Sequence, residues 1–167
     1  MRNTILTGLA LAISAALVVV LSSTFDLGLE SAALLGVAVG AVVALVPDRT
    51  PVFRVAGFMA GFVIAFVGYA ARAAALPDSA GGQAIVVALV VLLCVTATAT
   101  SLERLPLWST LLGAASVAGA YEFTFADAVP EMASTSVSTA TALLLTVAVG
   151  FLAAAFVAPA YSNNRTG

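Results

Sequence analysis

Long apolar stretches alternate with short polar breaks along the whole chain of 167 residues. Each stretch is close to the ~20 residues that a helix needs to cross about 30 Å of hydrocarbon. The stretches are continuous and do not alternate residue by residue, which favours helices over membrane strands of about ten residues. We therefore predict an all-α fold, a polytopic membrane helical bundle that forms a single domain over 1–167. Its six transmembrane helices are expected at 5–23, 31–46, 52–75, 83–101, 106–125 and 133–158.

The sharpest break is the polar turn from Pro47 to Pro51. Thr50 is the expected N-cap of the third helix, and Pro51 takes its first position, where a missing N–H costs nothing. The first stretch follows Arg2 and has the look of a signal peptide. Its apolar part is too long for that and no small-residue cleavage site follows, so we predict a helix that is retained.

Composition supports a membrane protein. Hydrophobic residues make up 62% of the chain and charged residues 8%, with a mean hydropathy of +1.16. A soluble domain is about 45–50% apolar and about 25% charged. The sequence has no Lys and no His, and its pI near 4.8 argues against nucleic acid as a partner. A Lys-free acidic composition fits either adaptation to high salt or a GC-rich genome, and both explanations stay open.

The arginines predict how the chain is oriented. With the N-terminus inside, five of them fall on the cytoplasmic side and only Arg72 lies toward the outside. Positively charged residues in short loops favour the cytoplasm. We expect both termini to be cytoplasmic, with Arg49 and Arg54 as topology anchors, in a multi-pass protein of a prokaryotic cytoplasmic membrane or its equivalent. The five inside arginines are Arg2, Arg49, Arg54, Arg104 and Arg165.

The even spacing of the stretches points to a 3+3 repeat. A shift of 77 residues lays the first three helices on the last three and places Gly36 on Gly113. Because each unit has an odd number of helices, the second unit would be inverted in the membrane, as in many transporters. Apolar low-complexity sequence also produces such matches by chance, so an unrelated pair of halves remains the alternative.

Two glycine pairs are expected at helix–helix contacts. Gly36 and Gly40 lie four residues apart on the second helix, and Gly57 and Gly61 lie four apart on the third. Glycines with this spacing share one helix face and let two backbones approach closely. We interpret all four as packing residues and not as a ligand site.

Arg72 and Glu122 are the ionisable residues placed deepest in the predicted spans, each about one turn inside the outer end of its helix. Both side chains can reach the headgroups by snorkelling. The alternative is an interhelical Arg72–Glu122 pair at the mouth of a cavity. Charge at membrane depth is costly, so such residues are the default candidates for function.

Hydroxyl side chains gather near the inner end of the fourth helix and the outer end of the sixth. Such hydroxyls commonly bond the carbonyl four residues earlier in their own helix. A hydroxyl-lined path for a polar solute is the second interpretation. The single Cys94 is expected to be a buried small hydrophobe. The hydroxyl residues are Thr96, Thr98, Thr100, Ser134, Thr135, Ser136, Ser138, Thr139 and Thr141.

The missing residue types limit the chemistry. Without Lys there is no Schiff base, and without His there is neither a Ser–His pair nor a histidine proton shuttle. We expect no catalytic, cofactor-binding or metal-binding residues, no cofactor and no enzymatic activity. Two functions remain: a non-catalytic structural or accessory subunit of a membrane assembly, which the sequence favours, and a small transporter or channel-like protein for a neutral or cationic solute. The expected partners are the lipid bilayer and either further copies of the chain or other membrane subunits.

Overall fold

The computed structural model describes residues 2–25, 30–75, 80–102, 104–125 and 132–157, and their side chains over 5–24, 32–72, 81–102, 104–120 and 137–157. All regular secondary structure in these ranges is helical, which confirms the prediction of six helices. Every observed boundary lies within three residues of the expected one. The helices are α1 (Arg2–Phe25), α2 (Glu30–Leu45), α3 (Pro51–Ala75), α4 (Ala80–Thr100), α5 (Leu107–Phe125) and α6 (Met132–Val157).

Four of these helices are long and apolar enough to cross a membrane, which indicates an integral membrane protein. The spans are Ile5–Thr24, Pro51–Arg72, Gly81–Thr100 and Val137–Val157. The described apolar runs of the two central helices are shorter, Ala32–Leu45 in α2 and Leu107–Ala120 in α5. The 16 residues of α2 measure about 24 Å at 1.5 Å per residue, less than the hydrocarbon thickness of about 30 Å.

Local sequence sets the helix ends. The carbonyl of Thr50 accepts from the backbone N–H groups of Phe53 and Arg54 at 3.1 and 3.2 Å, so α3 starts directly after it, with Pro51 in its first turn. Just after the C-terminal end of α4, Leu102 has a φ of 55°. This left-handed conformation closes many helices, although glycine adopts it more readily than leucine.

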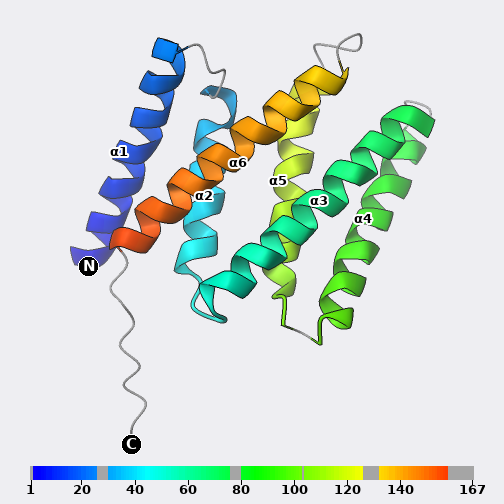
Figure 1. Ribbon diagram of the computed structural model, residues 1–167, viewed down its shortest axis with the longest axis horizontal. Helices are drawn as coiled ribbons and strands as arrows, with labels where there is room; N and C mark the ends of the chain where they lie inside the picture. Colours follow the sequence, from blue (N-terminus) through cyan, green and yellow to red (C-terminus); the bar gives the residue numbers. More distant parts are fainter. Residues whose placement is uncertain (1, 26–29, 76–79, 103, 126–131, 158–167) are drawn as a thin grey trace, which may run out of the picture.

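The helices alternate in direction, so connections collect at two ends of the molecule. The turn 46–50 and the connection around 101–106 lie at the same end as the start of α1 and the end of α6 (Figure 1). We call this the arginine end, after Arg49, Arg54 and Arg104. The opposite end, where α2, α4 and α6 begin, is the far end.

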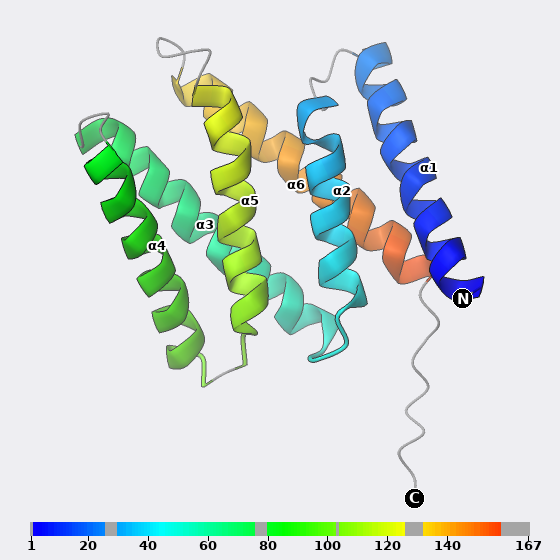
Figure 2. The same ribbon diagram turned by 180° about the vertical axis from the view of Figure 1, so that it is seen from behind.

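The helices form two groups of three, and neither group is continuous in sequence. In one, α6 packs extensively on α2, and α1 contacts both (Figures 1 and 2). In the other, α3 packs extensively on α5, and α4 contacts both. We call these groups the α1–α2–α6 bundle and the α3–α4–α5 bundle. The long helices α3 and α6 run obliquely across the upright α5 and α2, as Figure 2 shows from behind.

The two bundles meet along a narrower interface, which we call the seam. Across it, α5 touches α6, and α2 touches α3 and α5, all less extensively than the helices within each bundle. The main apolar core nevertheless extends over the seam, with Val43 of α2 and Leu143 of α6 in the same cluster as Phe58 and Phe62 of α3. The seam is thus narrow, and part of it is filled by the apolar core.

Within the α1–α2–α6 bundle, glycines bring α2 and α6 into backbone contact. A Cβ atom at Gly40 would collide with the Val147 carbonyl oxygen and the Phe151 backbone nitrogen. From the other side, a Cβ at Gly150 would collide with the backbone of Val37. Gly36 lies directly against the side chain of Thr146. The close crossing of α2 and α6 therefore depends on glycines in both helices.

The α3–α4–α5 bundle contains the same arrangement. A Cβ at Gly113 of α5 would collide with the Phe58 carbonyl oxygen and the Phe62 backbone nitrogen of α3. A Cβ at Gly61 of α3 would collide with the Thr110 carbonyl oxygen of α5. Gly57 is buried nearby but less tightly, since its nearest neighbours in α5 and the preceding connection lie 3.4 Å from an added Cβ.

We expect Gly113→Ala to lower the stability of the protein by about 1–3 kcal/mol, the usual cost of overpacking a close contact. The added methyl group must push α3 away from α5, because it meets backbone atoms that cannot rotate aside. Gly8→Ala is the matched control, since nothing lies within 4 Å of its Cβ position. Thermal unfolding of the purified protein in detergent measures both. Equal melting temperatures for the two variants would show that the crossing tolerates a side chain.

Candidate functional site

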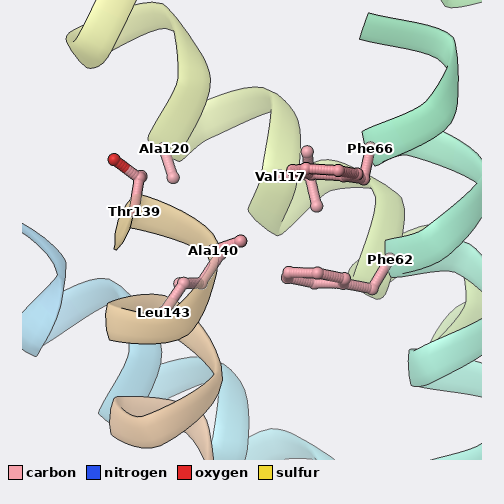
Figure 3. A pocket seen from close by; sticks show the side chains of 7 residues that line it. All are labelled: Phe62, Phe66, Val117, Ala120, Thr139, Ala140 and Leu143. Atoms are coloured by element: carbon pink, nitrogen blue, oxygen red, sulfur yellow. The ribbon is translucent and has the colours of Figure 1, made fainter. Parts of the chain in front are cut away.

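A small pocket opens in the seam, between α3 and α5 of one bundle and α6 of the other (Figure 3). Its volume is about 10 Å³, roughly that of one water-sized sphere. It lies farther from the arginine end than Arg54 and the α2–α3 turn do. The lining residues are Phe62, Phe66, Val117, Ala120, Thr139, Ala140 and Leu143.

The pocket lining is apolar and uncharged. Phe62 and Phe66 form one wall, and Ala140 and Leu143 of α6 form the opposite one (Figure 3). Thr139 is the polar member, and its hydroxyl points away from the two phenylalanine rings. The space is large enough for about one water-sized uncharged molecule, and its lining has no charged group.

At the arginine end, the side chain of Arg54 crosses the seam. Arg54 lies in the first turn of α3, is 6% exposed, and its Nη1 donates to the carbonyl oxygens of Val43 at 2.9 Å and Ala44 at 2.8 Å. The same nitrogen also donates to the carbonyl of Val46. These carbonyls belong to the end of α2 and the residue that follows it. Arg54 therefore caps α2 from the neighbouring bundle.

The cap has a clear physical cause. The last carbonyls of a helix have no partner within the helix, and their dipoles attract a cation. Carbonyls that are shielded from water need a donor from another part of the chain. All three bonds come from Nη1, so its two N–H groups are shared among the three carbonyls.

Two further hydrogen bonds hold α5 at the arginine end. Ser109, which is fully buried, donates to the backbone carbonyl of Arg54. The indole Nε1 of Trp108 donates to the Asp48 carboxylate in the α2–α3 turn. The start of α5 is thereby tied both to the first turn of α3 and to the turn that joins the two bundles.

Arg49 and Arg54 were predicted together as topology anchors, but their surroundings differ. Arg49 is exposed in the turn. Arg54 is buried, and its Nη1 donates to carbonyls at the end of α2, whereas its buried Nε has no hydrogen-bond partner among the described atoms. The sequence analysis missed this capping role, although an arginine four residues after the turn was visible.

Of the predicted Arg72–Glu122 pair, the structure describes only the side chain of Arg72. Arg72 lies in the last turn of α3 and is partly buried. Glu122 belongs to α5, but its side chain lies outside the described residues. The pair stays a prediction.

Several of the predicted hydroxyl residues donate hydrogen bonds to carbonyls of their own helices. Thr96, Thr100 and Thr141 are exposed, and each donates to the carbonyl four residues earlier. The Oγ1 of Thr98 is buried without a hydrogen-bond partner among the described atoms. Ser138 is exposed, and Thr139 lines the pocket. The side chains of Ser134, Thr135 and Ser136 lie outside the described residues.

Buried polar side chains inside the bundles are also bonded to the backbone. Thr110, Ser116 and Thr146 donate to carbonyl oxygens of their own or the immediately preceding helix turn at 2.8–3.2 Å. Cys94 is buried in the core, as expected for a small hydrophobe. Among the described residues, no group of three or more Cys, Asp or Glu could hold a metal ion.

No protein-family model matches the chain, and comparisons with curated proteins and with solved structures give no match either.

We expect Arg54→Met to lower the free energy of unfolding by about 1.5–3 kcal/mol, the usual contribution of hydrogen bonds to a charged group. Methionine keeps much of the apolar stem but leaves the carbonyls of Val43, Ala44 and Val46 without their donor. Arg49→Met, which removes an exposed arginine from the same turn, is the control and should change stability by less than about 0.5 kcal/mol. Denaturant unfolding in detergent, followed through the single Trp108, measures both variants. If Arg54→Met lowers the free energy of unfolding no more than Arg49→Met does, the capping role of Arg54 is wrong.

Proposed function

We propose that all six helices span the membrane as a 3+3 inverted repeat. The packing pattern supports this proposal, because it is unchanged when α1, α2 and α3 exchange places with α4, α5 and α6. Under this exchange the α2–α6 contact becomes the α5–α3 contact, and the α1–α6 contact becomes the α4–α3 contact. Each half places its third helix in the bundle of the other half.

The glycine crossings support a specific register for the repeat. Gly40 faces α6 as Gly113 faces α3, and Gly150 faces α2 as Gly61 faces α5. In this register, each residue of α2 corresponds to the residue of α5 that lies 73 positions later in the sequence. Each residue of α3 corresponds to the residue of α6 that lies 89 positions later. A single shift of 77 residues lies between these two values, so it aligns the helices but not their contact residues.

We propose that the arginine end is cytoplasmic, with both termini on that side. The exposed side chains of Arg49 and Arg104 lie in its two connections, which fits the preference of positively charged loops for the cytoplasm. Trp108 beside the turn suits the interfacial position that tryptophan favours.

For activity, we propose that the protein passes a small uncharged solute across the membrane along the seam. The observation that carries this proposal is the pocket at the junction of the two interlocked bundles. In inverted-repeat transporters, the substrate site lies near the bilayer midplane between the repeats. The lining has no charged residue, so a neutral solute fits it and a cation does not.

The second candidate is the role of a non-catalytic accessory subunit in a membrane assembly, which the sequence alone favoured. Its support comes from the buried hydroxyls. Those of Ser109, Thr110, Ser116 and Thr146 all donate to backbone carbonyls, so they hold helices in place and do not face a solute path. This arrangement fits a protein with a structural role.

We expect proteoliposomes containing the protein to swell in glycerol or urea faster than protein-free vesicles. Phe62→Trp should slow this flux several-fold, because the larger ring fills the pocket. Phe156→Trp is the matched control, since Phe156 is 85% exposed and lies away from the pocket. Ala140→Leu fills the pocket from α6 and should act as Phe62→Trp does. Absence of flux for every small uncharged solute would reject the transport proposal.

The accessory role makes a different prediction. Extraction in mild detergent from its native membrane, followed by native electrophoresis and mass spectrometry, should recover the chain with a second membrane protein in fixed proportion. A chain that migrates alone, or only with copies of itself, would contradict the accessory role and leave the transport proposal to the flux measurements.

A further inference from the structure

We infer that Arg54 fills a second copy of the pocket, which the inverted repeat places at the arginine end between α2, α3 and α6. This inference rests on the repeat in the proposed function, and it adds a second site for the same class of small uncharged solute. It also gives Arg54 a task besides capping α2, because its side chain closes that second site.

The two glycine crossings correspond atom by atom. A Cβ on the crossing glycine of α2 or of α5 would collide with a carbonyl oxygen of the partner helix and with the backbone nitrogen four residues later. The atoms contacted in α6 lie 89 positions after those contacted in α3, which is also the spacing from Gly61 to Gly150. The contacts are those of Gly40 with Val147 and Phe151, and of Gly113 with Phe58 and Phe62.

The reverse contacts agree as well. Gly150 meets the carbonyl oxygen of Val37, and Gly61 meets that of Thr110. These two acceptors lie 73 positions apart, which is the spacing of the crossing glycines in α2 and α5. The four glycines set the two spacings, and the backbone atoms that they contact match them independently. The repeat therefore relates positions in space, so residues at the two ends of the seam can be compared.

The register maps the pocket onto the end of α2. Leu143 of α6 corresponds to Arg54 of α3, 89 residues earlier. Val117 of α5 corresponds to Ala44 of α2, 73 residues earlier. In the pocket, Leu143 and Val117 line the same space (Figure 3). At the arginine end, Arg54 donates to the carbonyl oxygen of Ala44 at 2.8 Å, so the corresponding pair is in contact there too.

The side chains at these corresponding positions differ in reach. Leu143 leaves an unfilled volume of about 10 Å³ beside it. Arg54 is longer and extends to three carbonyls at the end of α2, and only 6% of it is exposed. The arginine side chain therefore occupies space that a leucine leaves open at the other end.

The lengths of α2 and α5 explain the difference between the two positions. Leu45, the last residue of α2, corresponds to Ala118, but α5 continues to Phe125. The carbonyls of α5 at this depth have partners four residues later in their own helix, whereas those at the end of α2 need a donor from elsewhere. An arginine is thus required beside α2, and a leucine is sufficient beside α5.

The remaining counterparts of the pocket lining carry no charge. They are Phe151, Ala155, Pro47, Thr50 and Pro51. Arg54 is then the one charged side chain among the seven corresponding positions. Without its guanidinium, the second site would accept a small uncharged solute as the pocket does, because no charge at this depth would need a partner.

The test separates the volume of Arg54 from its hydrogen bonds. Arg54→Met and Arg54→Ala both remove the donors and the charge, but methionine keeps most of the side-chain volume and alanine leaves a cavity. Ala44→Cys, made in a Cys94→Ala background, reports access to the second site, since Cys94 is the only native cysteine. Leu45→Cys is the matched control, because it is the next residue of α2 and is already 40% exposed.

We expect Arg54→Ala to raise the rate at which a small water-soluble thiol reagent labels Ala44→Cys at least about tenfold over Arg54→Met. Labelling of Leu45→Cys should agree within about twofold in the two variants, since both lose the cap and α2 frays equally. Arg54→Leu copies the residue at position 143. It should also exceed Arg54→Met several-fold, and it carries the test if the alanine variant does not fold. Emission from Trp108 checks the fold of every variant.

Equal labelling of Ala44→Cys in Arg54→Ala and Arg54→Met would overturn the inference, because the rate would then follow the lost cap and not the emptied space. Flux of glycerol or urea through the unmodified protein tests the proposed transport separately. Fast labelling in Arg54→Ala without any flux would reject the transport and keep the second site. Flux without a difference in labelling would keep the transport and reject the second site.

Discussion

Backbone contact between α2 and α6, and between α3 and α5, is the constraint on which the other contacts depend. Inside a membrane, apolar side chains gain little from leaving lipid for another helix, so close van der Waals contact must hold helices together. Gly40 and Gly150 provide it in one pair, and Gly61 and Gly113 in the other. Once these pairs are formed, α1 and α4 can pack against their sides. The division into two bundles follows from where four glycines lie.

The shortness of α2 creates the need that Arg54 meets. A helix of about 24 Å is shorter than the hydrocarbon layer, and its last carbonyls have no partner within the helix. A buried cation would be costly there by itself, and unpaired carbonyls would be costly as well. Bringing the two together satisfies the carbonyls of Val43, Ala44 and Val46 and partly neutralises the guanidinium with the dipole of α2. The result is a polar fastening exactly where the chain passes from one bundle to the other.

The helices could be predicted from sequence because apolar length and turn residues such as Thr50 and Pro51 act locally. The pairing of the helices could not, because it depends on contacts between glycines and backbone atoms that are far away in the sequence. Gly150 stands alone in an apolar run and carries no spacing motif, yet it faces the backbone of Val37 across the α2–α6 crossing. Arg54 was predicted to be a topology anchor and not a helix cap, because nothing in the sequence states that α2 ends beside it. The pocket follows from side chains of three helices and has no signature in any one of them.

The exchange of third helices also limits how far the bundles can move. The chain passes between them at residues 46–50, where α2 leads into α3, and again where α5 leads into α6. These two passages lie at opposite ends of the molecule, so the covalent connections tie the two bundles together at both ends of the seam. At the arginine end, the hydrogen bonds from Arg54 to the end of α2 reinforce the passage at 46–50, because they join the same two helices that the turn connects.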